Sequence, residues 1–137
     1  MSCVFKHDDE LGCIFVKWRG TFSRETADAY SRDVAALPGF HAGWNFFHDM
    51  RTADVKVPGT VVRDAARVDG PPCRPGGMRK AAILVSTDVA FGMMRMLAVF
   101  RERPGLTVDV FRDLEEAKAW LELPLEIGDP FADMTHE

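Results

Sequence analysis

The sequence predicts an α/β fold: an N-terminal β-hairpin followed by β-α units, giving a mixed, mostly parallel five-stranded sheet with four helices. Two β-rich runs near the N-terminus are separated by a short polar turn, which is typical of a hairpin. Apolar runs then alternate with segments whose apolar residues recur at helical spacing. The block 79–121 repeats the order strand, helix, strand, helix with almost no residues between elements, as in a parallel sheet.

The hairpin is expected from strands at 4–7 and 13–19. The first helix should begin after Ser23, because a serine side chain accepts a hydrogen bond from a free amide of the first turn. It should end before Pro38, which cannot continue a helix. Its apolar residues recur at helical spacing and define one buried face: Ala27, Tyr30, Val34 and Leu37.

A third strand is expected at 44–49, directly after Gly43. Pro58 suits the first turn of a helix that ends near Val68. A loop rich in proline and glycine occupies 69–78 and enters the next strand from its amino end. We expect this loop to lie at the pole of the sheet away from any strand-end site.

The run 79–87 predicts a buried strand closed by polar residues, and Asp88 opens a helix that ends near Glu102. A carboxylate in this position occupies the amide end of the helix. Asp88 is therefore interpreted as a cap and not as an active-site acid, and it disfavours a phosphate at the same helix end.

Residues 106–112 form the last predicted strand, and Asp113 begins the last helix. Glu116, three residues later, completes an Asp-x-x-Glu capping box. No periodicity follows this helix. We therefore expect a single domain over 1–123 and an extended C-terminal tail over 124–137.

Composition and charge exclude several classes of function. The 137 residues are 47% apolar and 28% charged, with a net charge of −4, as in an ordinary globular domain. A mildly acidic chain is a poor nucleic-acid binder, because that role requires clustered Lys and Arg. The longest uncharged run is too short to span a bilayer, and the N-terminus lacks the basic start and apolar core of a signal peptide. We therefore expect a cytoplasmic protein without a membrane span.

The cysteines supply no metal site. Cys3, Cys13 and Cys73 have no CxxC spacing, so reduced thiols are expected, and neither zinc nor another cofactor is implied. A hairpin centred near Glu10 would place Cys13 opposite His7 and away from Cys3.

Catalytic motifs are not found in the sequence. No serine lies in a nucleophile elbow, and no cysteine has a neighbouring histidine. His48 and Asp49 are adjacent on a predicted strand, so their side chains point to opposite faces and cannot form a dyad. We expect a protein that is not an enzyme.

Polar side chains gather where the predicted parallel strands end, and ligand sites in such sheets form beyond these carboxyl ends. Asp49 and Arg51 are the strongest pair, because an arginine there can bind a carboxylate or phosphate; a surface ion pair of small energetic worth is the simpler interpretation. Ser86 and Thr87 either bind a ligand or satisfy the strand and helix ends. The candidate ligand-binding residues are Asp49, Arg51, Thr52, Ser86, Thr87 and Phe91.

The helix expected at 88–102 is apolar nearly all round, whereas a helix covering one sheet needs only an apolar stripe. Its surplus face has three candidate partners: a second copy of the chain, the C-terminal tail anchored by Phe131, or an apolar ligand in a pocket. We favour the homodimer. The candidate interface residues are Phe91, Arg95, Met96 and Val99, with Arg95 at the rim.

Three motifs give the chain a family resemblance. They are Asp49-Met-Arg at a strand end, the strand Arg79-Lys-Ala-Ala-Ile-Leu-Val-Ser-Thr-Asp, and the closing Val110-Phe-Arg-Asp-Leu-Glu-Glu-Ala-Lys-Ala-Trp-Leu. Over roughly Val4 to Leu123 the chain resembles the SpoIIAA-like branch of the STAS family, the anti-sigma factor antagonist domains. The resemblance implies a mixed sheet with helices, a non-enzymatic role, and binding of proteins or small ligands.

The resemblance also implies a place for regulation. Antagonists of this family are switched by phosphorylation of a Ser or Thr at the start of the helix after the central strand. In this chain that place reads Val57-Pro-Gly-Thr60, so Thr60 is the candidate phospho-acceptor, and the family's Asp-Ser-Ser/Thr pattern is absent.

Two hypotheses of function follow. The first is a regulatory or protein-interaction module of STAS type, working as a homodimer through an exposed apolar patch around Met96 and Val99. The second is a carrier or sensor of a small apolar or amphipathic ligand in a closed apolar cavity, a plan that resembles the CRAL-TRIO lipid carriers in outline. That cavity would lie near Asp49, Arg51, Thr87 and Phe91.

Overall fold

The computed structural model of the chain describes residues 2–37, 44–55, 59–66, 79–101 and 106–134, so the proline- and glycine-rich segment 69–78 lies outside the described residues. The strands are β1 (Ser2–Asp8), β2 (Cys13–Thr21), β3 (Asn45–Asp49), β4 (Ala53–Asp54), β5 (Arg79–Leu84) and β6 (Leu106–Phe111). The helices are α1 (Arg24–Ala35), α2 (Gly59–Ala66), α3 (Asp88–Arg101), α4 (Leu114–Trp120) and the short 3₁₀ helix η1 (Leu125–Ile127).

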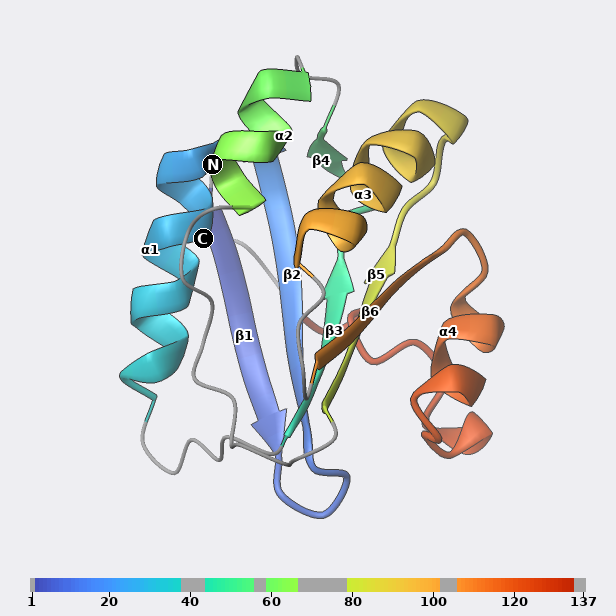
Figure 1. Cartoon of the computed structure of the whole chain (residues 1–137). Coiled ribbons are helices and arrows are strands. Elements are labelled where there is room, and N and C mark those ends of the chain that lie inside the picture. The colour runs from blue at the N-terminus through green and yellow to red at the C-terminus, as the bar shows by residue number, and fades with distance from the viewer. Residues whose placement is uncertain (1, 38–43, 56–58, 67–78, 102–105, 135–137) are drawn as a thin grey trace.

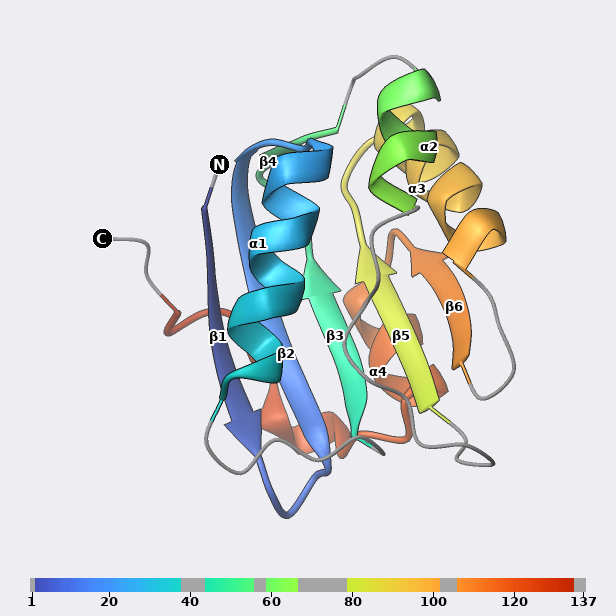
Figure 2. The ribbon, with the colours of Figure 1, turned by 60° about the vertical axis from the view of Figure 1, so that its left-hand side comes forward.

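The strands form one mixed sheet in the order β1-β2-β3-β5-β6, with β1 antiparallel to β2 and the other neighbours parallel. Figure 2 shows these strands side by side. The arrangement confirms the predicted α/β fold with an N-terminal hairpin and four α-helices. The short strand β4 is an addition, and it pairs in parallel with the end of β2, where Gly20 lies opposite Ala53.

Alternation of side chains along the strands builds an apolar layer on each face of the sheet. In β2, Ile14, Val16 and Trp18 contribute to the front layer, while Cys13 and Phe15 contribute to the back layer. Figures 1 and 2 show α1, α2 and α3 on the front face, and α4 with the C-terminal part of the chain on the back face. Each layer is therefore closed by a different part of the chain.

The hairpin register differs from the predicted one by one residue. Cys13 pairs with Asp8 and not with His7, because β1 continues to Asp8, whose carboxylate accepts hydrogen bonds from two amides of the turn. Cys3 lies opposite Trp18. The two described cysteines are thus apart, as expected, and both are free thiols.

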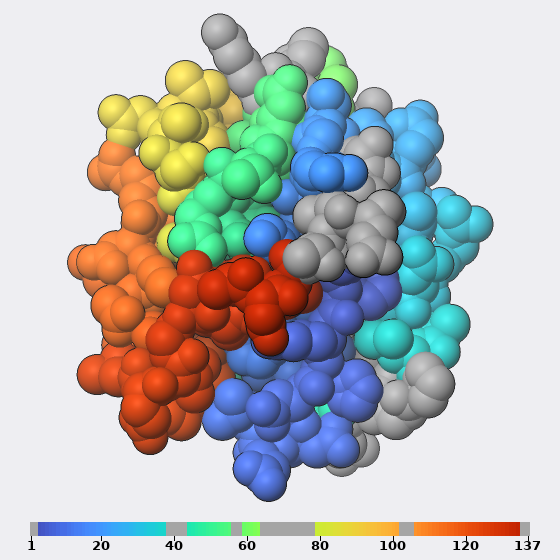
Figure 3. Space-filling view, turned by 180° about the vertical axis from the view of Figure 1, so that it is seen from behind, coloured from blue at the N-terminus to red at the C-terminus, as the bar shows by residue number. Residues whose placement is uncertain are grey.

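The C-terminal segment, which we define as residues 124–134, is not an extended tail. It contains η1 and further turns, and it lies across the back face of the sheet. Seen from behind in Figure 3, it crosses the molecule between the N-terminal strands and α4. Its Phe131 is fully buried in the back layer, so the hypothesis that Phe131 covers the outer face of α3 is wrong.

The last helix ends in a left-handed residue that is not glycine. Glu122 has a φ of 61°, and its amide donates to the carbonyl of Ala119, while the amide of Leu123 donates to the carbonyl of Lys118. This cap turns the chain from α4 into the C-terminal segment. A side chain with a Cβ atom adopts the left-handed conformation at a cost that glycine avoids.

Replacing Glu122 with glycine should therefore stabilise the protein by about 0.5–1 kcal/mol. Glycine relieves the strain of the left-handed conformation, and its greater conformational entropy in the unfolded chain offsets part of this gain. Equilibrium urea unfolding measures the change. Glu126→Gly is the matched control. Glu126 is exposed like Glu122, but among the described residues only Glu122 is a non-glycine residue with a positive φ. A lower unfolding midpoint for Glu122→Gly would contradict the strain at this cap.

Candidate functional site

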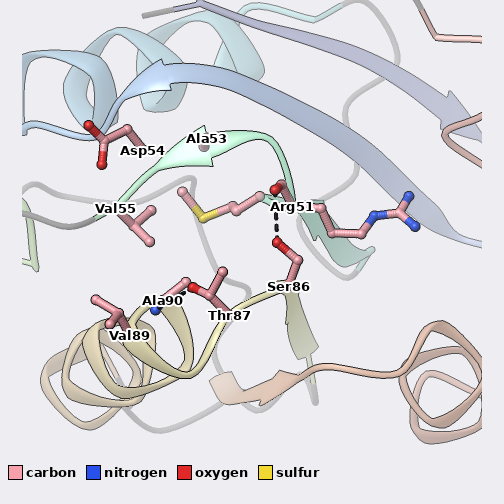
Figure 4. A pocket seen from close by; sticks show the side chains of 9 residues that line it. Arg51, Ala53, Asp54, Val55, Ser86, Thr87, Val89 and Ala90 are labelled. Carbon is pink, nitrogen blue, oxygen red and sulfur yellow. Dashed lines mark hydrogen bonds between the residues drawn. The ribbon is translucent and has the colours of Figure 1, made fainter.

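A cleft opens at the carboxyl ends of β3 and β5, where parallel sheets place their ligand sites. Its volume is about 320 Å³. In Figure 4 one wall comes from the residues that follow β3, and the other from the link between β5 and α3 with the first turn of that helix. The apolar lining is Met50, Ala53, Val55, Val89 and Ala90. The polar lining is Arg51, Asp54, Ser86 and Thr87.

Two hydroxyl groups in the cleft form hydrogen bonds within the protein. The Ser86 hydroxyl donates to the carbonyl of Arg51 at 3.0 Å, and Thr87 Oγ1 accepts from the amide of Ala90 at 3.1 Å. Thr87 therefore caps α3, and the expectation that Asp88 caps this helix is wrong. Asp88 is the first helical residue, and its carboxylate pairs with Arg112.

Asp49 and Arg51 form a tight pair that extends to the C-terminal segment. The Asp49 carboxylate, only 3% exposed, accepts from the Arg51 amide at 3.1 Å, from Nε at 2.8 Å and from Nη2 at 3.0 Å. Nη2 also donates to Asp129 at 3.0 Å. The Arg51 side chain points away from the cleft in Figure 4. In this arrangement the pair ties the end of β3 to the C-terminal segment, and ligand binding by the pair stays a prediction.

The charges of this network reinforce one another. Hydrogen bonding to Asp49 raises the pKa of Arg51, so the guanidinium stays charged. Burial on its own would raise the pKa of Asp129, but the amide of Phe131 and the guanidinium of Arg51 together lower that pKa below its usual value. Asp129 is therefore ionised in the folded protein at neutral pH.

Three of the candidate ligand-binding residues, Asp49, Thr52 and Phe91, do not line the cleft. The Thr52 hydroxyl donates to the carbonyl of Trp18 at 3.3 Å. The Phe91 ring is flanked by Arg112 and Arg95, whose guanidinium carbons lie 5.0 and 5.8 Å from its centre. The cleft therefore unites only part of the predicted set of residues.

The outer face of α3 carries a row of exposed apolar side chains. They are Val89, Met96, Val99 and Phe100, with exposed fractions of 48%, 37%, 72% and 47%. Gly92 lies between them along the helix, and a Cβ atom built on it would meet no atom within 4 Å. We call these five residues the α3 stripe.

The predicted interface residues lie on or beside the α3 stripe. Met96 and Val99 belong to it, Arg95 is exposed next to it, and Phe91 is half-buried. Thr60, the candidate phospho-acceptor, is exposed in the first turn of α2.

The helix α2 begins against the stripe, because a Cβ atom on Gly59 would lie 3.7 Å from the Met96 side chain. Charge added at Thr60 would therefore act close to the stripe. Phosphorylation of Thr60 stays a prediction.

His48 packs half-buried in the front layer, and sequence reasoning did not select it. The Trp18 indole donates to His48 Nδ1 at 3.0 Å, the Phe46 ring stacks on the imidazole at 5.9 Å, and Tyr30 meets it edge-on at 5.3 Å. Burial and the positive charge of Arg101 lower the pKa of His48 to about 3. His48 is therefore neutral in the folded protein at neutral pH.

His48 and Asp49 use opposite faces of the sheet, as predicted: His48 packs in the front layer and Asp49 binds Arg51 towards the C-terminal segment. Among the described residues there is no group of three or more His, Cys, Asp or Glu side chains that could hold a metal ion. Within the same residues no helix combines the length and the apolar character needed to cross a membrane.

Comparison with known proteins identifies a fold. No protein-family model matches the sequence, and no curated protein matches it. The structure is similar to the crystal structure of an uncharacterized DUF3478-family protein with a SpoIIAA-like fold from Shewanella loihica PV-4. The two chains share 15% sequence identity over 88% of this chain and 92% of that chain, with a TM-score of 0.55. A likeness at this identity shows the fold alone, and it confirms the SpoIIAA-like fold that the sequence motifs implied.

Proposed function

We propose that this protein is a regulatory or protein-interaction module without catalytic activity, and that it works in the cytoplasm as a homodimer. The α3 stripe is the observation that carries the proposal. Four of its side chains are large, apolar and exposed, and among the described residues only Leu125 shares these properties elsewhere. Single exposed apolar side chains are ordinary on a protein surface, whereas a contiguous row of them is typical of a contact site.

The spacing of the stripe suits pairing with a second copy of the chain. Its first four members are separated by three, four and three positions, the spacing that keeps a seam on one side of a helix. In a two-fold symmetric, antiparallel pair the stripe packs against itself, and Gly92 permits a close approach of the two helices. The same pairing sets the Asp88 end of each helix beside the Arg101 end of its partner, which is favourable for charges and helix dipoles.

A further observation supports the proposal. The SpoIIAA-like fold agrees with the sequence resemblance to antagonist domains that act through protein contacts.

Replacing Val99 with glutamate should convert the dimer to a monomer, because a two-fold interface would place two carboxylates in its apolar seam, where removing them from water is costly. Native mass spectrometry at micromolar concentration should show a dimer for the wild type and a monomer for Val99→Glu. Leu125→Glu is the matched control, since Leu125 is 62% exposed and lies away from α3. A monomeric wild type would overturn the homodimer, and a dimeric Val99→Glu would exclude the α3 stripe as its interface.

Ligand carriage is the second candidate function, and the cleft beside Ser86 and Thr87 favours it. Apolar walls with a few hydroxyl groups suit a small amphipathic molecule, and about 320 Å³ is the size of a small ligand pocket. Native mass spectra of the protein purified from its own host test whether it carries a ligand. An adduct of constant mass that is lost on denaturation supports a ligand, whereas a bare mass in every preparation counts against one. An addition of phosphate mass on the peptide containing Thr60 or Thr52 would instead report modification.

A further inference from the structure

The C-terminal segment binds the back face of the sheet without joining it. Among the described residues its backbone-to-backbone hydrogen bonds stay inside the segment, for example from the amide of Ala132 to Asp129 and from the amide of Met134 to Phe131. The strand pairings from β1 to β6 therefore do not depend on the segment. It resembles a bound peptide more closely than an element of the sheet.

An aromatic side chain anchors this peptide. Phe131 is fully buried, and its ring centre lies 4.9 Å from that of Phe47 and 6.0 Å from that of Phe15, with both ring pairs edge-to-face at 80°. Met134 at the end of the segment and Leu123, the residue that precedes the segment, fill the same back layer. A single buried ring with flanking apolar contacts is the usual form of a peptide anchor in a pocket.

Two lysines bind the backbone of the segment and not its side chains. Lys17 Nζ lies 3.4 Å from the carbonyl oxygen of Phe131 and 3.2 Å from that of Met134. Lys118 Nζ donates to the carbonyls of Leu125 at 3.2 Å and Gly128 at 2.9 Å, and the Lys118 side chain is completely buried. Contacts with carbonyl groups are available to any peptide, so these lysines suit a groove that accepts more than one sequence.

Acidic side chains on both sides of the anchor make the remaining polar contacts. Asp129 pairs with Arg51 at 3.0 Å, and Asp133 pairs with Lys6 at 3.0 Å. The two acids lie two residues before and two residues after Phe131. The back face thus contacts a phenylalanine that has a paired carboxylate on each side.

We propose that the back face of β1, β2 and β3 is a peptide-binding groove that the C-terminal segment occupies in cis. Its partner class is a protein segment of the form Asp-x-Phe-x-Asp, which binds when the chain's own segment leaves. The short connection through Glu122 keeps the cis segment at high effective concentration, so the groove is closed in the isolated protein. This groove lies on the face of the sheet opposite to the α3 stripe and is independent of it.

A binding experiment on the full-length chain tests the proposal. A fluorescent peptide of residues 123–134 is titrated with the Phe131→Ala protein and with the wild type, and anisotropy is recorded. We expect saturable binding to Phe131→Ala, and binding to the wild type weaker by about tenfold or more, because the intact cis segment competes. A peptide carrying Phe131→Ala, or Asp129→Asn with Asp133→Asn, should also bind about tenfold more weakly.

If Phe131→Ala fails to fold, Phe131→Leu replaces it in the titration, because leucine leaves a smaller cavity. Hydrogen exchange on the wild type is a second measurement that needs no variant. In the wild type the amides of Ala132 and Met134 should exchange through a local opening, faster than the amides of β3. The proposal is overturned if the peptide does not bind a folded variant, or if it binds the wild type equally well. Exchange of the segment only together with β3 would overturn it as well.

Discussion

Replacing Phe131 with alanine should lower the free energy of unfolding by about 3–5 kcal/mol, the cost of a large cavity in a packed core. The ring is fully buried and touches Phe47 and Phe15 edge-to-face, so the loss includes aromatic contacts as well as burial. The residue follows α4 in a segment whose sequence carries no periodic signal of burial. Urea unfolding monitored by circular dichroism measures the loss.

Leu125→Ala is the matched control, because Leu125 lies in the same segment and is 62% exposed. Its substitution should change the stability by less than about 0.5 kcal/mol. A loss below about 1 kcal/mol for Phe131→Ala would contradict the place of this residue in the core. If the segment undocks before the domain unfolds, adding Met134→Ala to Phe131→Ala should cost little more, since a detached segment has no further contacts to lose.

Most of the fold could be predicted because burial patterns determined it. In β5 the side chains of residues 81–84 are all buried, and a strand covered on both faces gives an uninterrupted apolar run. The boundaries of α1 and α4 follow from Ser23 and Asp113, whose side chains accept hydrogen bonds from first-turn amides at 3.2 and 2.9 Å. The sequence does not separate Thr87 from Asp88 as the cap of α3, because adjacent Thr and Asp residues carry equivalent cap signals; the hydrogen bond from the Ala90 amide selects Thr87.

The C-terminal segment could not be predicted, because no periodicity marks a segment that is held by side chains of other elements. Lys118 illustrates the difficulty. A lysine on a short amphipathic helix is expected in solvent, yet its ammonium is buried because two carbonyls and the Glu115 carboxylate, at 2.9 Å, satisfy it. The same holds for Asp49 and Arg51. Their spacing predicts a pair, but Asp129, which shares the arginine, lies far away in sequence.

The two proposed contact surfaces differ in their physical state. The α3 stripe is exposed in a single chain, so association there needs no prior rearrangement. The groove on the back face is filled, so binding there must first displace Phe131 and its polar contacts. With these two surfaces, a partner that binds the closed groove would leave contacts at the open α3 stripe in place. Thr60 follows Gly59, which lies against Met96, so the predicted phosphate would be added close to the open surface.

Acidification should destabilise the protein through His48. Its pKa is about 3 in the folded chain and 6.5 in the unfolded one, so the folded state carries a neutral imidazole throughout this range. Below about pH 6.5 the unfolded chain binds a proton that the folded chain cannot bind, and stability falls by roughly 1 kcal/mol for each pH unit down to about pH 3. Between about pH 7.5 and pH 4.5 the contribution of this one residue should therefore reach about 2–3 kcal/mol.

Urea unfolding of the wild type and of His48→Gln across this range isolates the effect, because other titrating groups are common to both proteins. Glutamine keeps an acceptor for the Trp18 indole, which donates to Nδ1 at 3.0 Å in the wild type, and it removes the titrating group. The difference in stability between the two proteins should shrink or reverse as the pH falls. Parallel curves would mean that His48 takes up a proton inside the fold, which the surrounding Phe46 and Tyr30 rings and the charge of Arg101 oppose.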